Sequence, residues 1–564
     1  MDRKTILAFA LIALIFILMP FYNKLFFPAQ DKSETTIEDR PAVGEAQMRA
    51  DEPPEQTDTA AVVEDEKPVK EEEPDSVIFE DTRPRRFVKV ETDLYEAVFS
   101  TKGASLVSFV LKKYEKSGGG KIDMASLGRR GVLLLKNQDA YLPSERMNYA
   151  VSDTALRLSV RDKEGKITFT WQDKSGVKIE KAYTFDNDKY SIVLDVDVEG
   201  AEALDIDKGY YLSWDSPLPL TETNAGEDLD PMGGYAMFGG ENLDFKDVDV
   251  GEEMHQEKSG TTAWVAQKSK YFTAAIIPDS RMGSGFYVNG TAREETFNEE
   301  KIERKYFDVG VYMESSGAEK YADEFIVYIG PIDYYLLSEY EVELEALVSM
   351  GWKIIQPFSV AVLWVFTQLH HIIPNYGIVI VLFSILIKIV LFPLSRKSMT
   401  SMAKMQDIQP KIKEIQEKYK SDRNKLSQET MKLYKEHGVN PFGSCLPLIL
   451  QMPLFYALFV VFRSTIELRG ASFMLWITDL SQMDPYYVLP IVMGATMFIQ
   501  QKLTIKDPKQ KMMVYLMPAL FTFLFYSMPA GLVLYWTMYN ILSLIEQLYI
   551  RRNLASSGST AVKE

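Results

Sequence analysis

Residues 376–394 are YGIVIVLFSILIKIVLFPL, an apolar run that contains one full charge, Lys388. About 20 residues of helix cross a hydrocarbon core of about 30 Å, so this run predicts a membrane-spanning helix. Lys388 lies eight residues before Arg396, the first charge beyond the run. At about 1.5 Å per residue, Lys388 is roughly 12 Å inside that end of the helix. A cation at this depth costs at least about 2.5 kcal/mol unless it faces water or a partner.

Two interpretations of Lys388 follow. Its aliphatic stem can extend to the nearby interface, or its ammonium group can line a wet cavity. We favour the cavity because the same run also carries Ser384 and other apolar runs carry Gln451, Gln500 and Asn540. Gln451 and Asn540 could instead join helices through hydrogen bonds worth about 1 kcal/mol each. We expect no Asp or Glu in the middle of another span, so Lys388 is predicted to face water without a countercharge.

The composition indicates a membrane topology. The chain has 564 residues and a formal net charge of -17, with acidic residues mostly before 350 and basic clusters after 394. This length predicts more than one domain, and the charge asymmetry indicates orientation in a membrane more than nucleic-acid binding. Cys445 is the only cysteine, and the four histidines show no metal-ligand spacing. We therefore expect no disulfide, no metal site and no cofactor.

The N-terminal residues predict an anchor and a tether. Residues 1–28 contain the apolar run 6–21 after two basic residues and no small-x-small cleavage site. An uncleaved transmembrane anchor with a cytoplasmic N-terminus is therefore expected. Residues 29–82 are rich in Glu, Asp, Pro and Thr and almost free of aromatic residues. Such a segment buries too little apolar surface to fold, so we expect a disordered acidic linker.

Residues 83–335 predict a large antiparallel β-sandwich. Apolar residues alternate with polar ones in the short runs 155–160, 167–171 and 192–198, and turn signals separate the runs. This period of two is typical of strands that bury one face. The run at 118–121, GGGK, lacks the spacing of a phosphate loop, and His255 is the only histidine of the segment. We therefore expect a folding, docking or spacer role outside the cytoplasm and no catalysis.

Residues 336–375 predict an amphipathic helix on the outer membrane face. The apolar part, 358–369, is short and flanked by Pro357 and Pro374. If it crossed the membrane, the run 376–394 would carry the following basic loop to the outside, against the positive-inside rule. An interfacial helix with Trp352 and Trp364 near the headgroups satisfies that rule.

Residues 395–441 predict a cytoplasmic helical hairpin. Residues 395–440 carry 11 Lys and Arg against 6 Asp and Glu. A first helix is expected before a turn at 421–424, and a second helix at 426–437 is stopped by Gly438. The hairpin is either a solvated loop or a contact surface for a ribosome, a targeting factor or an incoming chain. The candidate contact residues are Met405, Ile408, Ile412, Ile415 and Tyr419.

Residues 442–552 predict four further spans, at 442–462, 487–500, 512–527 and 532–549. The connections alternate in charge as an N-inside anchor requires, with basic residues at 502–511 and 551–552. The prediction is six spans, followed by a short cytoplasmic tail at 553–564. The fold class is therefore a multi-pass α-helical membrane protein with a large periplasmic β-sandwich domain.

Several motifs between residues 351 and 551 resemble the YidC/Oxa/Alb family of membrane protein insertases. They are KIVLFPLS at 388–395, TSMAKM at 400–405, QPKI at 409–412, VNP at 439–441, CLPL at 445–448, QMP at 451–453, WITDL at 476–480, DPYYVLP at 484–490 and GLVLYW at 531–536. The anchor, the β-rich segment and the runs WVA at 264–266 and YF at 271–272 resemble the Gram-negative form of the family.

This resemblance implies a five-helix core around a hydrophilic groove and an outer β-super-sandwich similar to sugar-mutarotase folds. The arginine of the family falls on Lys388, which keeps the charge but loses the planar fork that grips carboxylates. Ser384, Gln451, Trp536 and Asn540 fall on groove-lining or near-groove positions.

The resulting prediction is an insertase and chaperone, not an enzyme, of the cell inner membrane. Its expected partners are nascent membrane-protein segments, the Sec translocon with its accessory subunits, a ribosome or targeting factor, and membrane lipid, but no specific nucleic acid. Both termini are expected in the cytoplasm. The alternatives are a small-solute transporter or channel, which would predict an internal repeat, and a membrane-anchored periplasmic glycan-binding domain.

Overall fold

The computed structural model describes residues 84–125, 132–137, 147–153, 155–159, 163–174, 176–204, 206, 208–315, 319–438, 446–505 and 511–560. They belong to one compact unit, Glu80–Glu564. The predicted anchor at 1–28 and the predicted linker at 29–82 lie outside these residues.

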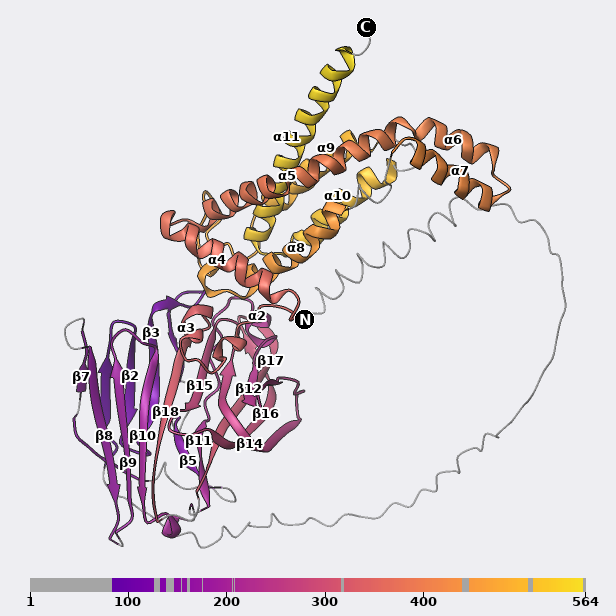
Figure 1. Cartoon of the computed structure of the whole chain (residues 1–564). Coiled ribbons are helices and arrows are strands. Elements are labelled where there is room, and N and C mark those ends of the chain that lie inside the picture. The colour runs from indigo at the N-terminus through magenta and orange to yellow at the C-terminus, as the bar shows by residue number, and fades with distance from the viewer. Residues whose placement is uncertain are drawn as a thin grey trace, which may run out of the picture. The chain divides into compact units, whose positions relative to one another are not determined.

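A small sheet begins the strand-rich part of the chain (Figure 1). Its strands lie in the order β4 (Lys121–Asp123), β3 (Ser105–Glu115), β2 (Tyr95–Ser100), β1 (Phe87–Glu91) and β7 (Ala155–Arg157). The pair of β1 and β7 is parallel, while the other pairs are antiparallel. The expectation of a wholly antiparallel sandwich is therefore wrong at this edge, where β7 returns to the sheet after a long connection.

The large sheet is antiparallel throughout its described ladder. Its order is β5 (Leu134–Lys136), β11 (Gly209–Trp214), β17 (Glu300–Glu314), β16 (Gly283–Phe297), β14 (Glu253–Lys268), β15 (Phe272–Pro278), β18 (Lys320–Pro331), β10 (Ser191–Glu199), β9 (Lys178–Asp186), β8 (Glu164–Gln172) and β6 (Ala150–Val151). A side branch places β12 (Gly233–Phe238) on β14 and β13 (Glu241–Phe245) on β12.

The alternating pattern predicts the buried faces of β8 and β10 correctly. Ile167 and Phe169 are fully buried on β8, and the apolar residues of β10 are buried at every second position. Phe99 of β2 packs on Tyr183 of β9 with the ring centroids 4.6 Å apart. This contact joins the two sheets, as a sandwich core requires. The run predicted at 155–160 forms only the short strand β7 within the described residues.

Short helices connect the strands and lead out of the large sheet. They are η1 (Ala201–Leu204), α2 (Ala225–Leu229), α3 (Tyr334–Ser338) and η2 (Leu344–Leu347). The side chain of Asp333 caps α3 by accepting hydrogen bonds from the N–H groups of Tyr335 and Leu336. Such a cap fixes where a helix begins, because the first N–H groups have no partner inside the helix.

The remaining described residues are mainly helical. The helices are α4 (Gln356–Ile372), α5 (Tyr376–Asp407), α6 (Gln409–Lys418), α7 (Arg423–Glu436), α8 (Leu446–Ser464), η4 (Ile466–Leu468), α9 (Val488–Thr504), α10 (Lys511–Phe525) and α11 (Ala530–Thr560). Phe366 of α4 contacts Phe383 of α5 and Phe462 of α8. These rings belong to one apolar cluster that joins α4, α5, α8, α9, α10 and α11.

The helix α5 is longer than the predicted span. It contains Pro393 and continues beyond Leu394, where the span was expected to end, to Asp407. A proline removes one backbone hydrogen bond, but long helices of membrane proteins tolerate this loss. By length and composition, one helix among the described residues can cross a membrane, and it covers Tyr376–Ser401. The count of six spans therefore stays a prediction.

The helical hairpin has the predicted form, while its cytoplasmic location stays a prediction. Helices α6 and α7 pair through Ile408, Ile412 and Leu433, and the turn between them ends at Asp422, which caps α7. Gly438 follows α7 with a φ of 59°, a left-handed value that favours glycine. At the C-terminus, α11 runs to Thr560, beyond the expected end of the last span at 549.

Candidate functional site

The side chain of Lys388 on α5 points at one face of α11. Its Nζ lies 2.7 Å from Oε2 of Glu546 and donates a hydrogen bond of 2.8 Å to Oγ of Ser543. The same atom lies 4.6 Å from the ring centroid of Tyr539. The three partners are spaced i, i+4 and i+7, which places them on one face of a helix. An ammonium group has three donors, and these three contacts occupy its surroundings.

The ion pair with Glu546 overturns one expectation from the sequence. Lys388 was predicted to have no countercharge, whereas a carboxylate contacts it directly. The sequence signal was present, because Glu546 lies inside the predicted span 532–549. It was missed because it is only three residues from the end of that run, where a carboxylate is expected to reach the interface. On the helix, however, it falls on the same face as Tyr539 and Ser543.

Glu546 connects α11 to two turns of α5. Its Oε2 contacts Lys388 and also accepts a hydrogen bond of 3.1 Å from Oγ of Ser395. Lys388 and Ser395 are seven residues apart and therefore lie on one face of α5. The other oxygen, Oε1, is buried and has no hydrogen-bond partner among the described residues. Lys388 is 8% exposed and Glu546 is 7% exposed, so the protein encloses the pair.

Ser384 and Gln451 lie near this pair in the fold but differ in their bonding. Ser384 is fully buried, and its Oγ donates to the carbonyl of Ile380 in its own helix. Gln451 of α8 is also buried, yet its Nε2 has no hydrogen-bond partner among the described residues. The hydroxyl of Ser384 is therefore satisfied locally, whereas the amide of Gln451 lies beside the hydroxyls of Tyr535 and Tyr539 and its Nε2 makes no hydrogen bond of normal geometry within the described part of the chain.

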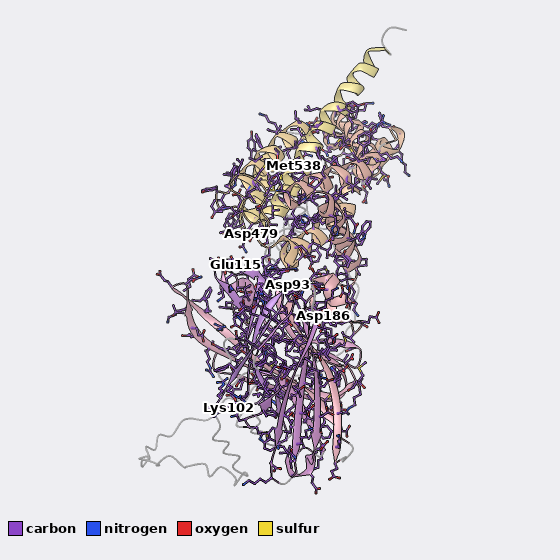
Figure 2. All side chains as sticks on the ribbon, turned by 90° about the vertical axis from the view of Figure 1, so that its left-hand side faces the viewer. Asp93, Lys102, Glu115, Asp186, Asp479 and Met538 are labelled. Carbon is purple, nitrogen blue, oxygen red and sulfur yellow. The ribbon has the colours of Figure 1, made fainter. Side chains whose placement is uncertain are left out.

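Trp536 and Asn540 project from α11 and have free donors. The indole Nε1 of Trp536 and the amide Nδ2 of Asn540 are buried without a hydrogen-bond partner in the described part of the chain. The ring of Trp536 packs against Phe455 of α8, with the centroids 4.9 Å apart. Figure 2 labels the neighbouring residue Met538 within the helical part of the molecule. The aromatic packing fixes the indole while its N–H stays unpaired.

A further amide of the same helix joins this set. Gln547 donates a hydrogen bond of 2.7 Å to Oγ1 of Thr504 on α9, and its Oε1 is buried without a partner among the described residues. The unpaired buried side-chain atoms of α8 and α11 among the described residues are Nε2 of Gln451, Oη of Tyr535, Nε1 of Trp536, Nδ2 of Asn540, Oε1 of Glu546 and Oε1 of Gln547. We call this set the polar line. Each such atom costs free energy in a dry apolar environment, so together they require water or a polar guest.

The structure brings the five sequence-predicted residues onto three helices without bonding them to each other. Among the described residues, no hydrogen bond joins any two of Lys388, Ser384, Gln451, Trp536 and Asn540. The direct partners of Lys388 are instead residues that the sequence did not single out. They are Tyr539, Ser543 and Glu546.

The C-terminal half of α5 carries a cationic hollow. A cavity of about 530 Å³ is lined by one face of α5 and by Gly438 after α7. The lining residues are Pro393, Arg396, Lys397, Thr400, Ser401, Lys404 and Gly438. Three of these side chains are cationic and two are hydroxyls, so the hollow attracts anionic groups.

The hairpin residues divide into two groups. Ile408 and Ile412 are buried between α6 and α7, while Met405 and Ile415 pack at the edge of that cluster. The buried pair therefore forms the interior of the hairpin and is covered from any partner. Tyr419 is half-buried at the turn, with the ammonium group of Lys418 5.5 Å from its ring centroid. Of the five predicted contact residues, the three at the edge and the turn are accessible.

The strand domain offers no metal cluster in its described residues. No group of three or more His, Cys, Asp or Glu is placed to hold a metal ion in the described part of the chain. His255 is exposed, with its Nδ1 2.7 Å from Oδ1 of Asn289 and its Nε2 3.6 Å from Glu257.

Two family models match the chain. Residues 368–557 match the 60Kd inner membrane protein family, and residues 87–360 match the YidC periplasmic domain. A relative from Chlorobaculum parvum, named membrane protein insertase YidC, is 33% identical over 589 residues, with 100% of this chain and 96% of the relative covered. Another of the same name, from Chlorobium luteolum, is 34% identical and covers 84% of this chain and 83% of its own.

Solved structures resemble the chain only loosely. A crystal structure described as an active YidC insertase with its first transmembrane domain resolved has a TM-score of 0.36 and 19% identity. The match covers 82% of this chain and 92% of that one. A galactose mutarotase-like protein from Lactobacillus casei has a TM-score of 0.25 and 12% identity, covering 43% of this chain and 99% of that one.

Proposed function

The chain belongs to the YidC family of membrane protein insertases, and we propose that its polar line and Lys388 receive the polar flank of a segment during insertion. The insertion of membrane proteins is the activity of the family, whose members are integral inner-membrane proteins with a periplasmic domain. It is not an enzyme activity. Our proposal concerns the path of the substrate, whose polar flank would pass along the polar line and Lys388.

The observation that carries this proposal is the set of unpaired buried atoms on α8 and α11. In hydrocarbon, an unsatisfied polar group costs several kcal/mol, so a protein retains such groups where water or a polar guest can pair with them. The polar flank of a substrate has the same difficulty when it crosses lipid. When the flank contacts the polar line, the donors and acceptors of the flank pair with the unpaired atoms of the protein, so neither set stays unsatisfied.

Charge gives this route a preference. Lys388 lies about two turns before the cationic hollow formed by Arg396, Lys397 and Lys404, which occupy another face of the same helix. An acidic flank arriving from the cytoplasm would meet the hollow first and Lys388 second. Because charge interactions strengthen where water is excluded, Lys388 would stabilise a carboxylate more than the exposed cations do.

The hairpin is proposed as the first docking surface for the apolar part of the substrate. Met431 of α7 is 48% exposed, and Met405, Ile415 and Tyr419 are partly accessible. Flexible and aromatic side chains adapt to many apolar partners. A ribosome, a targeting factor and the Sec translocon are further proposed partners, and membrane lipid surrounds the helices.

Photo-crosslinking tests the route. A crosslinking residue at Gln451 or Asn540 should capture the polar flank of a ribosome-stalled single-span substrate. The same group at Ile491, which is 60% exposed on α9, is the control and should not capture that flank. Capture at Ile491 without capture at the two buried positions would contradict the route.

Substitution of Lys388 tests the charge preference. Lys388→Ala should impair insertion more for segments with acidic translocated flanks than for neutral ones, whereas Lys388→Arg should be mild. The measurement is protease protection of the flank in proteoliposomes. Equal loss for acidic and neutral segments in the alanine variant would remove Lys388 from substrate selection.

A further inference from the structure

We propose that Glu546 is a resident competitor for Lys388 and thereby sets how strongly the protein prefers acidic segments. This inference rests on the proposed function, in which Lys388 binds a carboxylate of the substrate. In the structure, that position is already occupied, because Oε2 of Glu546 lies 2.7 Å from Nζ of Lys388. A substrate carboxylate can therefore reach the ammonium group only by displacing Glu546.

The ammonium group of Lys388 has two further neighbours besides the carboxylate of Glu546. Its Nζ also donates to Oγ of Ser543, and the ring of Tyr539 covers another side at 4.6 Å. An ammonium group can donate three hydrogen bonds. Exchange of one carboxylate for another preserves these contacts, whereas addition of a second one would break them.

The bonding of Glu546 suits a group that is exchanged. A buried ion pair that serves structure alone is stable only when hydrogen bonds satisfy its remaining atoms. Glu546 has one oxygen shared between Lys388 and Ser395, while its Oε1 is buried without a partner among the described residues. The unpaired oxygen lowers the cost of removing this carboxylate from its site.

Once displaced from Lys388, the carboxylate of Glu546 can pair with another cation. Glu546 lies five residues before Arg551, toward the cytoplasmic end of α11. A segment that brings an acidic residue to Lys388 frees Glu546 to pair with a basic residue of the same segment. The occupied site therefore favours segments that carry both signs of charge, and it weakens the capture of segments with a single acidic residue.

The test compares three single variants and one double variant of the full chain in proteoliposomes. They are Glu546→Gln, Lys388→Gln, the double variant, and Asp407→Asn as the control. Asp407 is an exposed carboxylate at the end of α5, so its substitution changes the net charge equally without touching the pair. The probes are one single-span segment with a neutral translocated flank and the same segment with one aspartate in that flank.

Glu546→Gln should raise the ratio of aspartate-bearing to neutral insertion by roughly three- to tenfold, since a neutral amide competes less well for an ammonium group. Asp407→Asn should leave the ratio unchanged. The rise should vanish in the double variant, because there is then no ammonium group to compete for. A rise of the same size in the double variant would overturn the proposal, because it would come from charge at a distance.

Ser395→Ala provides a second test that keeps both charges. It removes the hydrogen bond of 3.1 Å to Oε2 of Glu546 and should raise the ratio in the same direction by a smaller factor. One outcome would overturn the competitor role of Glu546 and leave the proposed function intact. In that outcome the ratio is unchanged in Glu546→Gln and in Ser395→Ala, while Lys388→Gln inserts the aspartate probe poorly. An unchanged ratio in Lys388→Gln would overturn both.

Discussion

The contact with Glu546 changes the role that the buried cation of Lys388 can have in the protein. A lone buried cation requires a guest or water, whereas a paired one is also part of the framework. The pair connects α5 to α11, and both side chains are almost fully enclosed. Breaking a buried pair by removing one partner costs more than replacing both, because the remaining charge stays buried.

We therefore expect Lys388→Met to destabilise the protein by about 3 kcal/mol, because it leaves Glu546 charged and buried. The double variant Lys388→Met, Glu546→Leu should recover most of this loss. Thermal unfolding in detergent micelles measures both effects, with Lys397→Met, an exposed lysine of the same helix, as the control. A double variant that is no more stable than the single one would show that the pair has no such energetic coupling.

Lys181 is a second buried cation, in the core of the strand domain. It is fully buried, and its Nζ donates hydrogen bonds to the carbonyls of Gly103 and Leu133 at 2.9 and 2.8 Å. Burial disfavours the charged form and lowers the pKa of Lys181 to about 7. In the unfolded chain the same amine keeps its ordinary pKa of 10.5. At a pH between about 7 and 10.5, unfolding is therefore accompanied by the uptake of a proton by this amine.

Because of this difference in pKa, the contribution of Lys181 to the free energy of unfolding depends on pH. On folding, Lys181 must lose the proton that it holds in the unfolded chain, and this loss costs less free energy as the pH rises from 7 toward 10. The free energy of unfolding should therefore increase with pH, by at most about 1.4 kcal/mol per pH unit from this lysine. Lys181→Met should remove this contribution. Urea unfolding of the full chain at pH 7 and pH 9 measures the two slopes. Because Lys268 also has a lowered pKa, of about 8, the difference between wild type and variant is the relevant quantity. Identical slopes would contradict a pKa near 7.

At the scale of elements, the hairpin depends on a small apolar interior. Ile412 of α6 and Leu433 of α7 are buried against each other's helices, and few other apolar residues support them. Ile412→Ala should therefore open the hairpin, at a cost of about 2–4 kcal/mol. Faster hydrogen exchange of the amides of α6 and α7 would report this opening, and Gln428→Ala, at an exposed position of α7 outside the proposed docking surface, should leave exchange unchanged. If insertion also falls in Ile412→Ala alone, the folded hairpin is required for substrate docking.

The crossing of α9 and α10 depends on a glycine. A Cβ at Gly494 would overlap the hydroxyl of Thr522 on α10, so the two helices approach closely only because this side chain is absent. Gly494→Val should push them apart and destabilise the protein by about 1–3 kcal/mol. Ala495→Val places the same side chain at the adjacent exposed position and is the matched control. Equal thermal stability of the two variants would show that the helices adjust freely.

The same elements show what sequence can predict. The period of two located β8 and β10, and the apolar stripe with Gly438 located the hairpin, because local patterns decide these features. The extent of α5 was missed, because the prediction ended with the apolar run at Leu394, whereas the helix continues through the charged residues that follow to Asp407. The parallel pairing of β1 with β7 was also missed, since it joins segments far apart in the chain.

The roles of the candidate site residues stay predictions, and the sequence indicated only some of the residues that meet around Lys388. The motifs indicated Lys388, Gln451, Trp536 and Asn540, and the unpaired atoms of the last three support a polar role. Glu546 could be identified only from the structure, because the packing of α11 on α5 brings its carboxylate to Lys388. Composition at the end of an apolar run does not distinguish a carboxylate that reaches solvent from one that turns inward.

At the scale of the whole molecule, two ion pairs connect the strand domain to the chain around η4. Arg469 lies 2.7 Å from Oε1 of Glu222, and both side chains are buried. The same guanidinium donates to the carbonyl of Glu115 at 2.7 Å. Arg463 lies 3.3 Å from Oδ2 of Asp230, with both side chains partly exposed. The two pairs therefore join the same parts of the protein in different solvent environments.

Their contributions to stability should differ accordingly. Arg469→Met leaves Glu222 buried without its cation and should cost about 3 kcal/mol, whereas Arg463→Met removes a solvated pair and should cost less than about 1 kcal/mol. Thermal unfolding of the full chain, followed by intrinsic fluorescence, measures both. High salt should shrink the effect of Arg463→Met and leave that of Arg469→Met nearly unchanged, because screening acts on exposed charges. Equal and small losses in the two variants would mean that the β-domain is held by other contacts, and that this buried pair does not couple its unfolding to that of the helices.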